Sequence, residues 1–328
     1  MLSALAIVLI CSNWLAFAIG VVSNILVTVL CFMVHNEEIR VFRWGFAMVS
    51  IVELAECFVL TALQIGLEHM DGTTAVLLMG FVAYFPKVVV MIFYLAFLAL
   101  FVLRTLSLPI SFVYRYAIIC GKQRLRSFFT IRNVIILLIF LNLTSLLISA
   151  VSVPAIYSYK TNFTEGDLQG LGYIVVVHFL DEFRGCTMFF CATCIVLFVV
   201  AYTLIGYTTT SVYRLLSASA ISSKTKALQK ELTVVMLLQA LLPVIFTIVP
   251  MIIFTTMLYG NLRFGPQASL SAALLNWQTC FNPILTLWFV KPFRKKIASR
   301  FANSSTETVA DIHTTCRAKG PADGDVKQ

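Results

Sequence analysis

The longest apolar segment of the chain is residues 82–116, which read VAYFPKVVVMIFYLAFLALFVLRTLSLPISFVYRY. A membrane-spanning helix needs about 20 mostly apolar residues. This segment is therefore long enough to cross a bilayer at a tilt and to continue past its inner surface. We interpret it as the central helix of a membrane protein.

Six further apolar segments of sufficient length flank the central one. Across the 328 residues, 60% are hydrophobic and only 12% are charged, which is unusual for a soluble domain. Each span should be helical, because no barrel-like alternation appears and lipid cannot satisfy an open backbone. The predicted fold is an all-α bundle of seven transmembrane helices. Its spans are expected at 5–34, 44–66, 82–116, 131–156, 183–210, 231–258 and 268–290.

The distribution of lysine and arginine predicts the orientation of the bundle. One side and the tail carry most of these cations, whereas the opposite side has Lys160, Arg184 and Arg263. The cations of the richer side are Arg40, Arg43, Arg115, Lys122, Arg124, Arg126, Arg132, Arg214, Lys224, Lys226, Lys230, Lys291, Arg294, Lys295, Lys296, Arg300, Arg317, Lys319 and Lys327. Basic loops stay in the cytoplasm, so the N-terminus should be outside and the C-terminus inside.

Two further features agree with this orientation. The sequon Asn162-Phe163-Thr164 falls in an outer loop, so we predict a glycan on Asn162. The net charge of +9 is juxtamembrane, where it meets anionic lipid, and no nucleic-acid partner is expected.

Polar residues within the spans lie at similar depths and predict a polar layer across the bundle. A buried charge in lipid needs a partner, so Arg104 should pair with Glu53 or Glu56. The layer is either a switch that rearranges between two helix packings or a static structural ion pair. Its expected members are Asn24, Glu53, Glu56, Arg104, Gln239 and Asn282.

Prolines within the last two spans indicate bends. Pro243 and Pro250 interrupt the sixth span, and Pro283 interrupts the seventh. Each removes one backbone hydrogen bond and permits a kink.

The nine cysteines predict packing rather than chemistry, because most fall within spans. The pair Cys191 and Cys194 lacks a second pair or a nearby histidine, so no metal site and no cofactor are expected. Residues 58–119 contain no cysteine, so a disulfide from the top of the third span to the second outer loop cannot form. An intramembrane enzyme would need converging catalytic groups, whereas the histidines are scattered. They are His35, His69, His178 and His313.

Two sequences at the inner ends of spans resemble motifs of G-protein-coupled receptors. The third span ends in Tyr114-Arg115-Tyr116, a variant of the aromatic-or-acidic, arginine, aromatic triplet. The seventh ends in Asn282-Pro283, followed by apolar and basic residues over 292–301 that suit a short amphipathic helix on the inner leaflet. Residues 1–301 then form the receptor domain, and 302–328 form a disordered cytoplasmic tail.

The chain as a whole resembles the nematode serpentine chemoreceptors of the Str superfamily, most closely class delta (Srd). The similar segments are Tyr84-Phe85-Pro86-Lys87-Val88, Phe112-Val113-Tyr114-Arg115-Tyr116, Leu228-Gln229-Lys230-Glu231-Leu232, Leu238-Gln239-Ala240-Leu241-Leu242-Pro243, Asn282-Pro283-Ile284-Leu285-Thr286 and Phe289-Val290-Lys291-Pro292-Phe293-Arg294. The resemblance implies a chemosensory receptor in the plasma membrane of sensory cilia. Such a receptor detects a small molecule and signals to a heterotrimeric G protein. An orphan seven-span channel or transporter-like protein is the alternative, whereas a retinal pigment would need a lysine in 268–290 and none is present.

Two sets of candidate residues follow from this reading. Those expected to face an outer ligand cavity are Tyr84, Lys87, Met91, Tyr94, His178, Phe190, Phe254, Trp277 and Gln278. Lys87 either meets an anionic ligand group, or reaches the headgroups or pairs with Asp181 or Glu182. Those expected to contact the G protein are Tyr114, Arg115, Tyr116, Lys224, Lys226 and Lys230. For Arg115 the alternative is an anchor to headgroup phosphates.

Overall fold

The structure is a computed structural model that describes residues 4–34, 37–70, 73–162, 173–179, 184–218, 223–260 and 264–299. Residues 302–328, where a disordered tail was expected, lie outside this range.

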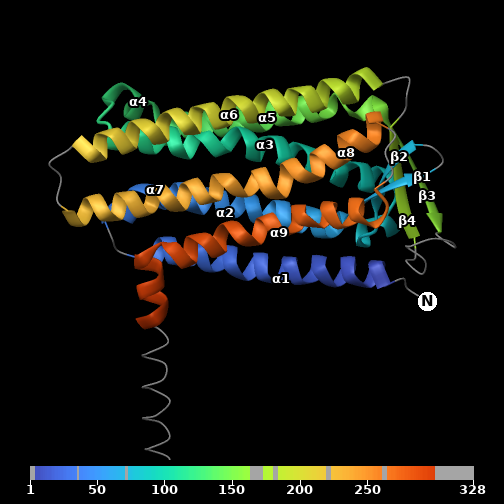
Figure 1. Ribbon diagram of the computed structural model, residues 1–328, viewed down its shortest axis with the longest axis horizontal. Helices are drawn as coiled ribbons and strands as arrows, with labels where there is room; N and C mark the ends of the chain where they lie inside the picture. The colour runs from blue at the N-terminus through green and yellow to red at the C-terminus, as the bar shows by residue number, and fades with distance from the viewer. Residues whose placement is uncertain are drawn as a thin grey trace, which may run out of the picture.

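Seven long helical segments run side by side along the length of the molecule (Figure 1). Six of them are single helices: α1 (Ala4–Met33), α2 (Glu37–Leu63), α3 (Lys87–Ile119), α5 (Ile131–Ala150), α6 (Arg184–Ala218) and α9 (Pro266–Phe289). The remaining one, the sixth along the chain, consists of α7 (Ser223–Pro243), the π-helix η4 (Val244–Ile248) and α8 (Val249–Gly260). A short helix, α4 (Gln123–Phe128), connects α3 to α5. A helix thus occupies most of each of the seven expected segments.

The outside of the bundle is apolar. On α5, Phe140 is 63% exposed and Leu147 is 69% exposed, and large aliphatic side chains of α6 are exposed in the same way. So broad an exposed apolar surface is not stable in water, but it suits lipid. Within the described residues, five helical segments are long and apolar enough to cross a membrane. They lie in α1, α3, α5, α6 and the joined α7 and α8.

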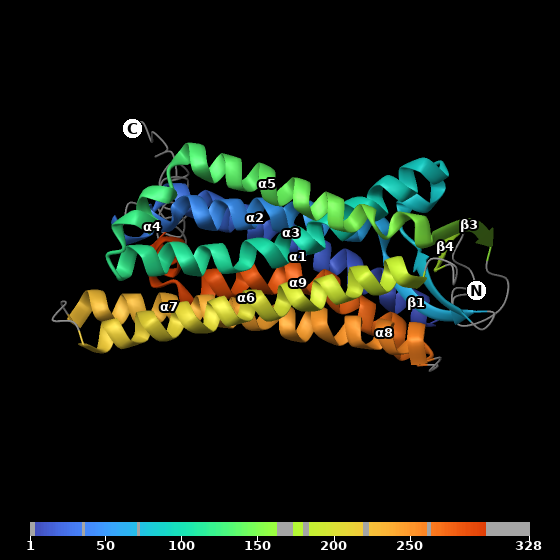
Figure 2. The same ribbon diagram turned by 90° about the horizontal axis from the view of Figure 1, so that it is seen from above.

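One end of the bundle carries a four-stranded antiparallel sheet, which the sequence analysis did not predict. Its strands are β1 (Ile65–Met70), β2 (Thr73–Leu78), β3 (Ile156–Asn162) and β4 (Tyr173–Phe179), in the order β1-β2-β4-β3. Figure 2 shows the sheet at the end of the bundle where α1 begins. The all-α prediction therefore holds for the bundle and is wrong for the two loops at this end.

The same sheet explains why two helices end earlier than expected. Gln64 adopts a left-handed conformation with φ of 45°, and this ends α2 before β1 instead of at residue 66. Pro154 follows α5 closely and lacks the N–H that would extend the hydrogen bonding of this helix, and the chain turns into β3 soon after Ala150. Ile65, Gly66 and Ile156, which the expected spans included, belong to β1 and β3, and the other strand residues fall in the expected outer loops.

The sheet ties the two loops together without a disulfide. Four residue pairs join β2 to β4, from Ala75 opposite His178 to Leu78 opposite Val175. None of the eight cysteines within the described residues forms a disulfide. Ser269 of α9 also holds β1, because its Oγ accepts from the Leu67 N–H (3.1 Å) and donates to the Leu67 carbonyl (2.8 Å).

Gly80 permits the close approach between the end of α2 and the start of the third helical segment. Its N–H donates to the Leu63 carbonyl (2.9 Å). A Cβ at this position would lie 2.1 Å from the carbonyl oxygen of Ala62, far inside van der Waals contact. Only glycine therefore fits here without moving the backbone.

The opposite end of the bundle is longer than expected. α6 continues to Ala218 and α7 begins at Ser223, so Lys224, Lys226 and Lys230 lie on a helix rather than in a loop. After α9, residues 291–299 form a further helix that turns away from the bundle (Figure 1). Phe293 anchors it, since this ring is fully buried in an apolar cluster with Val27 of α1 and Val235 of α7.

Candidate functional site

A cavity lies beneath the sheet, between the ends of four helical segments. The space between its lining atoms, with the open solvent at its mouth included, measures about 760 Å³. β1 and β2 contribute its roof, and α3, α6, α8 and α9 contribute its walls. The lining residues are Ile65, Leu67, Val76, Tyr94, Phe97, Leu98, Phe101, Ser152, Thr187, Phe190, Cys191, Pro250, Met251, Phe254, Ala272 and Leu275.

Three of the predicted ligand residues line this cavity. They are Tyr94, Phe190 and Phe254. Phe97, Leu98 and Phe101 follow Tyr94 at helical spacing on the same face, so periodicity could have found them. The strand residues of the roof carried no such signal, because their segments were taken as span ends and loops.

The other predicted ligand residues lie elsewhere. Tyr84 is 64% exposed and Lys87 is exposed, because α3 begins only after Pro86 and its first turn lies outside the cavity. Met91 is half-buried but is not among the lining residues. His178 belongs to β4, and its side chain lies outside the described part of the structure.

Two residues of α9 expected in the cavity face other helices. The Trp277 indole N–H donates to Ser12 Oγ of α1 (2.9 Å). Gln278 is buried deeper, where its Oε1 accepts from Thr247 Oγ1 of η4 (2.6 Å). Both side chains therefore join α9 to its neighbours.

A buried ion-pair cluster lies at mid-depth, between α2 and α3. Arg104 Nη1 donates to Glu56 Oε2 at 2.6 Å, and Nη2 lies 3.5 Å from Glu53 Oε1. The exposed fraction of the Arg104 side chain is 11%, and those of Glu53 and Glu56 are 4% and 6%. The arginine thus pairs with both of the glutamates that the sequence analysis considered. At this depth, lipid and packed protein provide no water that could replace either partner.

Asn282 extends the cluster to α9, since its Nδ2 donates to Glu53 Oε1. Gln239 of α7 reaches the same helix, donating to Thr286 Oγ1 (2.6 Å) and to the Asn282 carbonyl (3.3 Å). On the other side, Asn24 of α1 donates to the Thr279 carbonyl at 3.1 Å. All six residues of the expected polar layer therefore lie in hydrogen bonds that connect α1, α2, α3 and α7, mostly through α9.

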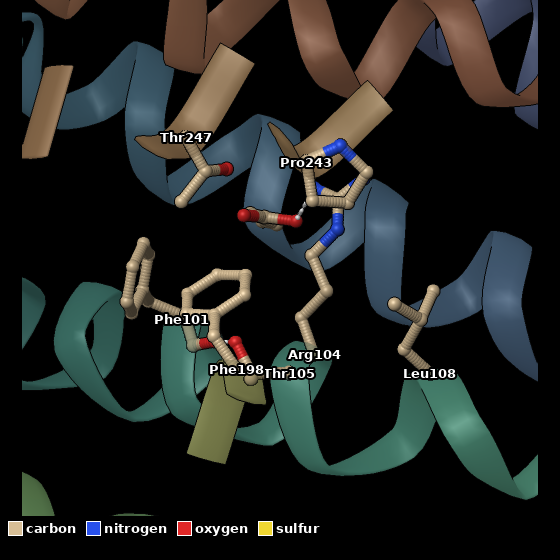
Figure 3. Close-up of a pocket in the computed structure, with 8 residues that line it drawn as sticks. Phe101, Arg104, Thr105, Leu108, Phe198, Pro243 and Thr247 are labelled. Atoms are coloured by element: carbon tan, nitrogen blue, oxygen red, sulfur yellow. Dashed lines mark hydrogen bonds and ion pairs between the residues drawn. The ribbon is translucent and has the colours of Figure 1, made fainter. Parts of the chain in front are cut away.

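A second, smaller cavity lies against the cluster (Figure 3). Its lining comprises Glu56, Phe101, Arg104, Thr105, Leu108, Phe198, Pro243 and Thr247. Phe101 lines both cavities, so the larger cavity and the surroundings of the ion-pair cluster share one side chain.

Pro243 marks the bend of the sixth helical segment. The π-helix Val244–Ile248 follows it directly, which is where a helix that lacks one N–H relieves strain. Tyr202 of α6 holds this region, since its hydroxyl donates to the Ala240 carbonyl at 2.5 Å.

At the far end of α3, the Arg115 side chain packs against α7. It is only 3% exposed, and its Nη1 donates to Met236 Sδ at 3.4 Å. Tyr114 packs on Phe129, with ring centroids 5.0 Å apart. Tyr116 packs on Tyr207 of α6 at 6.1 Å. Arg115 is therefore not presented at the surface in this conformation, and the side chains of Lys224, Lys226 and Lys230 lie outside the described residues.

Seven packed helical segments, a polar layer at mid-depth and a buried arginine at the end of the third segment are the arrangement of the G-protein-coupled receptors. The crystal structure of squid rhodopsin matches with a TM-score of 0.63 over 90% of this chain and 84% of that chain. The two sequences are 14% identical, so the likeness concerns the fold. No lysine lies on α9, so this chain lacks the residue that would bind retinal there.

The family is narrower than the fold. A family model described as serpentine type 7TM GPCR chemoreceptor Srd matches residues 9–299. The chain therefore belongs to this family, as the resemblance in its sequence indicated. It is a multi-pass integral membrane protein and a receptor rather than an enzyme. No curated protein sequence matches it.

Proposed function

We propose that this protein is a chemosensory receptor of the plasma membrane that binds a small molecule in the cavity beneath the sheet and activates a heterotrimeric G protein. The sheet faces outside, all seven helical segments cross the bilayer, and the helix at 291–299 lies on the inner leaflet with its cations toward the headgroups. Placement in sensory cilia follows from the family's chemosensory role.

The observation that carries the proposal is the shared side chain Phe101. A ligand in the outer cavity contacts Phe101, and Phe101 also lines the smaller cavity together with Arg104, Glu56 and Pro243. Movement of Phe101 therefore changes the packing around the ion-pair cluster and the bend of the sixth segment. Because packed helices switch between discrete arrangements, a small shift there is passed on as a helix movement.

Activation would open the inner end of the bundle. Gln239 and Asn282 connect the sixth and seventh segments next to Pro243 and Pro283, so both segments can bend together. Such a bend moves Met236 away from Arg115. The freed guanidinium can then donate hydrogen bonds to backbone carbonyls of a G-protein tail, with Tyr114, Tyr116 and the lysines of α7 around it.

The proposal is tested by expressing the receptor in a reporter cell with a panel of volatile and polar metabolites. G-protein activation by at least one compound is the expected result. The matched variant is Ala272→Leu, which fills the wall of the cavity without touching the ion-pair cluster. It should reach the cell surface and lose the response. A ligand-evoked ionic current that persists without any G protein would instead identify the channel alternative.

A further inference from the structure

The chemistry of the outer cavity restricts the ligand that it can hold. None of its sixteen lining residues is charged, and four of them are phenylalanines: Phe97, Phe101, Phe190 and Phe254. Roof residues such as Leu67 and Val76 are buried, so they shield the interior from the water outside. A carboxylate or ammonium group placed here would lose its hydration and gain no counter-charge. The lining therefore favours an uncharged ligand.

Three lining residues carry a hydroxyl, and one of these hydroxyls lacks a partner. Thr187 is 3% exposed, and its Oγ1 makes no hydrogen bond. Ser152 differs, because its Oγ donates to the Ser149 carbonyl at 2.6 Å. Tyr94, the third, lies on the opposite wall, on α3.

Within the described residues, two threonines of α6, Thr187 and Thr209, have buried hydroxyls without a hydrogen bond, and only Thr187 lines the cavity. Thr203 and Thr210, also on α6, each donate to the backbone carbonyl one turn earlier, both at 2.7 Å. Membrane helices satisfy hydroxyls in this way because lipid provides no acceptor. A buried hydroxyl that is left unsatisfied destabilises the protein unless something else accepts its hydrogen bond. The wall of the cavity is where a bound molecule can provide that acceptor.

We propose that the cavity binds a compact, uncharged, mainly apolar molecule with one accepting oxygen, such as a ketone, aldehyde or ester, and that Thr187 donates a hydrogen bond to that oxygen. The phenylalanines pack on the hydrocarbon part, and Thr187 selects for the oxygen. The inference rests on the proposed function only in taking this cavity as the ligand site. It replaces the idea that Lys87 binds an anionic group, because Lys87 does not line the cavity.

The experiment measures binding to the purified receptor in micelles without a G protein. Unfolding is followed with a thiol-reactive dye that labels buried cysteines such as Cys31, Cys57 and Cys280 as they become exposed. The probes are four eight-carbon compounds: 2-octanone, octanal, octane and sodium octanoate. 2-Octanone and octanal should raise the unfolding temperature of the parent protein in a saturable way, and octanoate should not. Thr187→Val should weaken 2-octanone binding about five- to tenfold, which corresponds to one lost hydrogen bond, and leave octane unchanged.

Two variants control for the substitution itself. Thr187→Ser keeps the hydroxyl and should bind 2-octanone like the parent. Thr203→Val removes a hydroxyl of the same helix that faces away from the cavity, so it should change neither ligand. If Thr187→Val does not fold, Thr187→Ala is used with the same expectation.

Each contrary outcome overturns a stated part of the proposal. Equal stabilisation by octanoate and 2-octanone would refute the uncharged class. Unchanged 2-octanone affinity in the Thr187 variants, or no saturable shift with either carbonyl compound, would refute the hydroxyl as the recognition group. A receptor that binds as expected but activates no G protein would refute the proposed function alone, whereas signalling evoked only by carboxylates would refute the ligand class alone.

Discussion

Replacing Arg104 by leucine should severely reduce the amount of folded receptor. The substitution removes the 2.6 Å hydrogen bond to Glu56 and the 3.5 Å contact with Glu53, and it leaves two carboxylates buried beside an apolar side chain. The Asn282 amide still donates to Glu53, but Glu56 loses the only charged partner that the described residues give it.

The size of the effect follows from burial. Breaking a buried ion pair by removing one partner costs about 3–5 kcal/mol, because the remaining charge is no longer compensated. Folded proteins are stable by only ~5–15 kcal/mol, so a large share of the stability is lost. We expect the unfolding temperature to fall by roughly 5–10 °C. The surface level in cells should fall with it.

The assay compares surface level in intact cells with the unfolding temperature of the purified protein. Arg124→Leu is the matched control, since Arg124 is exposed on α4 and its loss should change stability by less than about 0.5 kcal/mol. The double variant Arg104→Leu with Glu56→Leu should recover much of the loss, because an apolar replacement of a whole buried pair is often nearly neutral. If Arg104→Leu is as stable as Arg124→Leu, or if the double variant is no better than the single one, the buried pair is not what stabilises this region.

Three further outcomes are expected. Gly80→Ala should abolish folding or cost at least ~3 kcal/mol of stability, because its Cβ would lie 2.1 Å from the Ala62 oxygen. Gly206→Ala, which has open space around its Cβ, should be tolerated. Equal surface levels of the two variants would contradict the close approach at Gly80. In eukaryotic cells Asn162 should carry a glycan, and a tag after Gln328 should be labelled only after permeabilisation. Labelling of this tag on intact cells would refute the orientation with the N-terminus outside. Arg115→Ala should reach the surface and lose ligand-evoked G-protein activation, measured once an agonist is found; full activation would leave Arg115 with no coupling role.

The bundle could be predicted from sequence because its signals are long and repeated. About 20 apolar residues in a row have few other structural solutions, and buried charges such as Arg104 and Glu56 must find each other within the layer that lipid surrounds. The depth of each residue along its helix was therefore enough to predict which residues form the polar layer.

The outer end could not be predicted in the same way. A short apolar run such as Val175-Val176-Val177 fits a strand or part of a helix equally well, and only its pairing with β2 decides between them. The left-handed turn at Gln64 carries no signal either, because glycine and asparagine are the residues that normally mark it. The third span was expected to begin at residue 82, whereas α3 begins at Lys87, and this difference placed Tyr84 and Lys87 in the expected cavity. Interpreting β1 and β2 as a span end and a loop left out Leu67 and Val76.

The pairing of β2 with β4 has a consequence for how the outer end assembles. Residues about 100 positions apart in sequence must meet before these hydrogen bonds form, so the roof is completed only after α3 and α5 are in place, and it forms late in folding. Because backbone hydrogen bonds rather than a sulfur bridge close it, its integrity does not depend on an oxidising compartment or on an isomerase. Treatment of intact receptor with a reducing agent should therefore leave the roof, and ligand binding beneath it, unchanged.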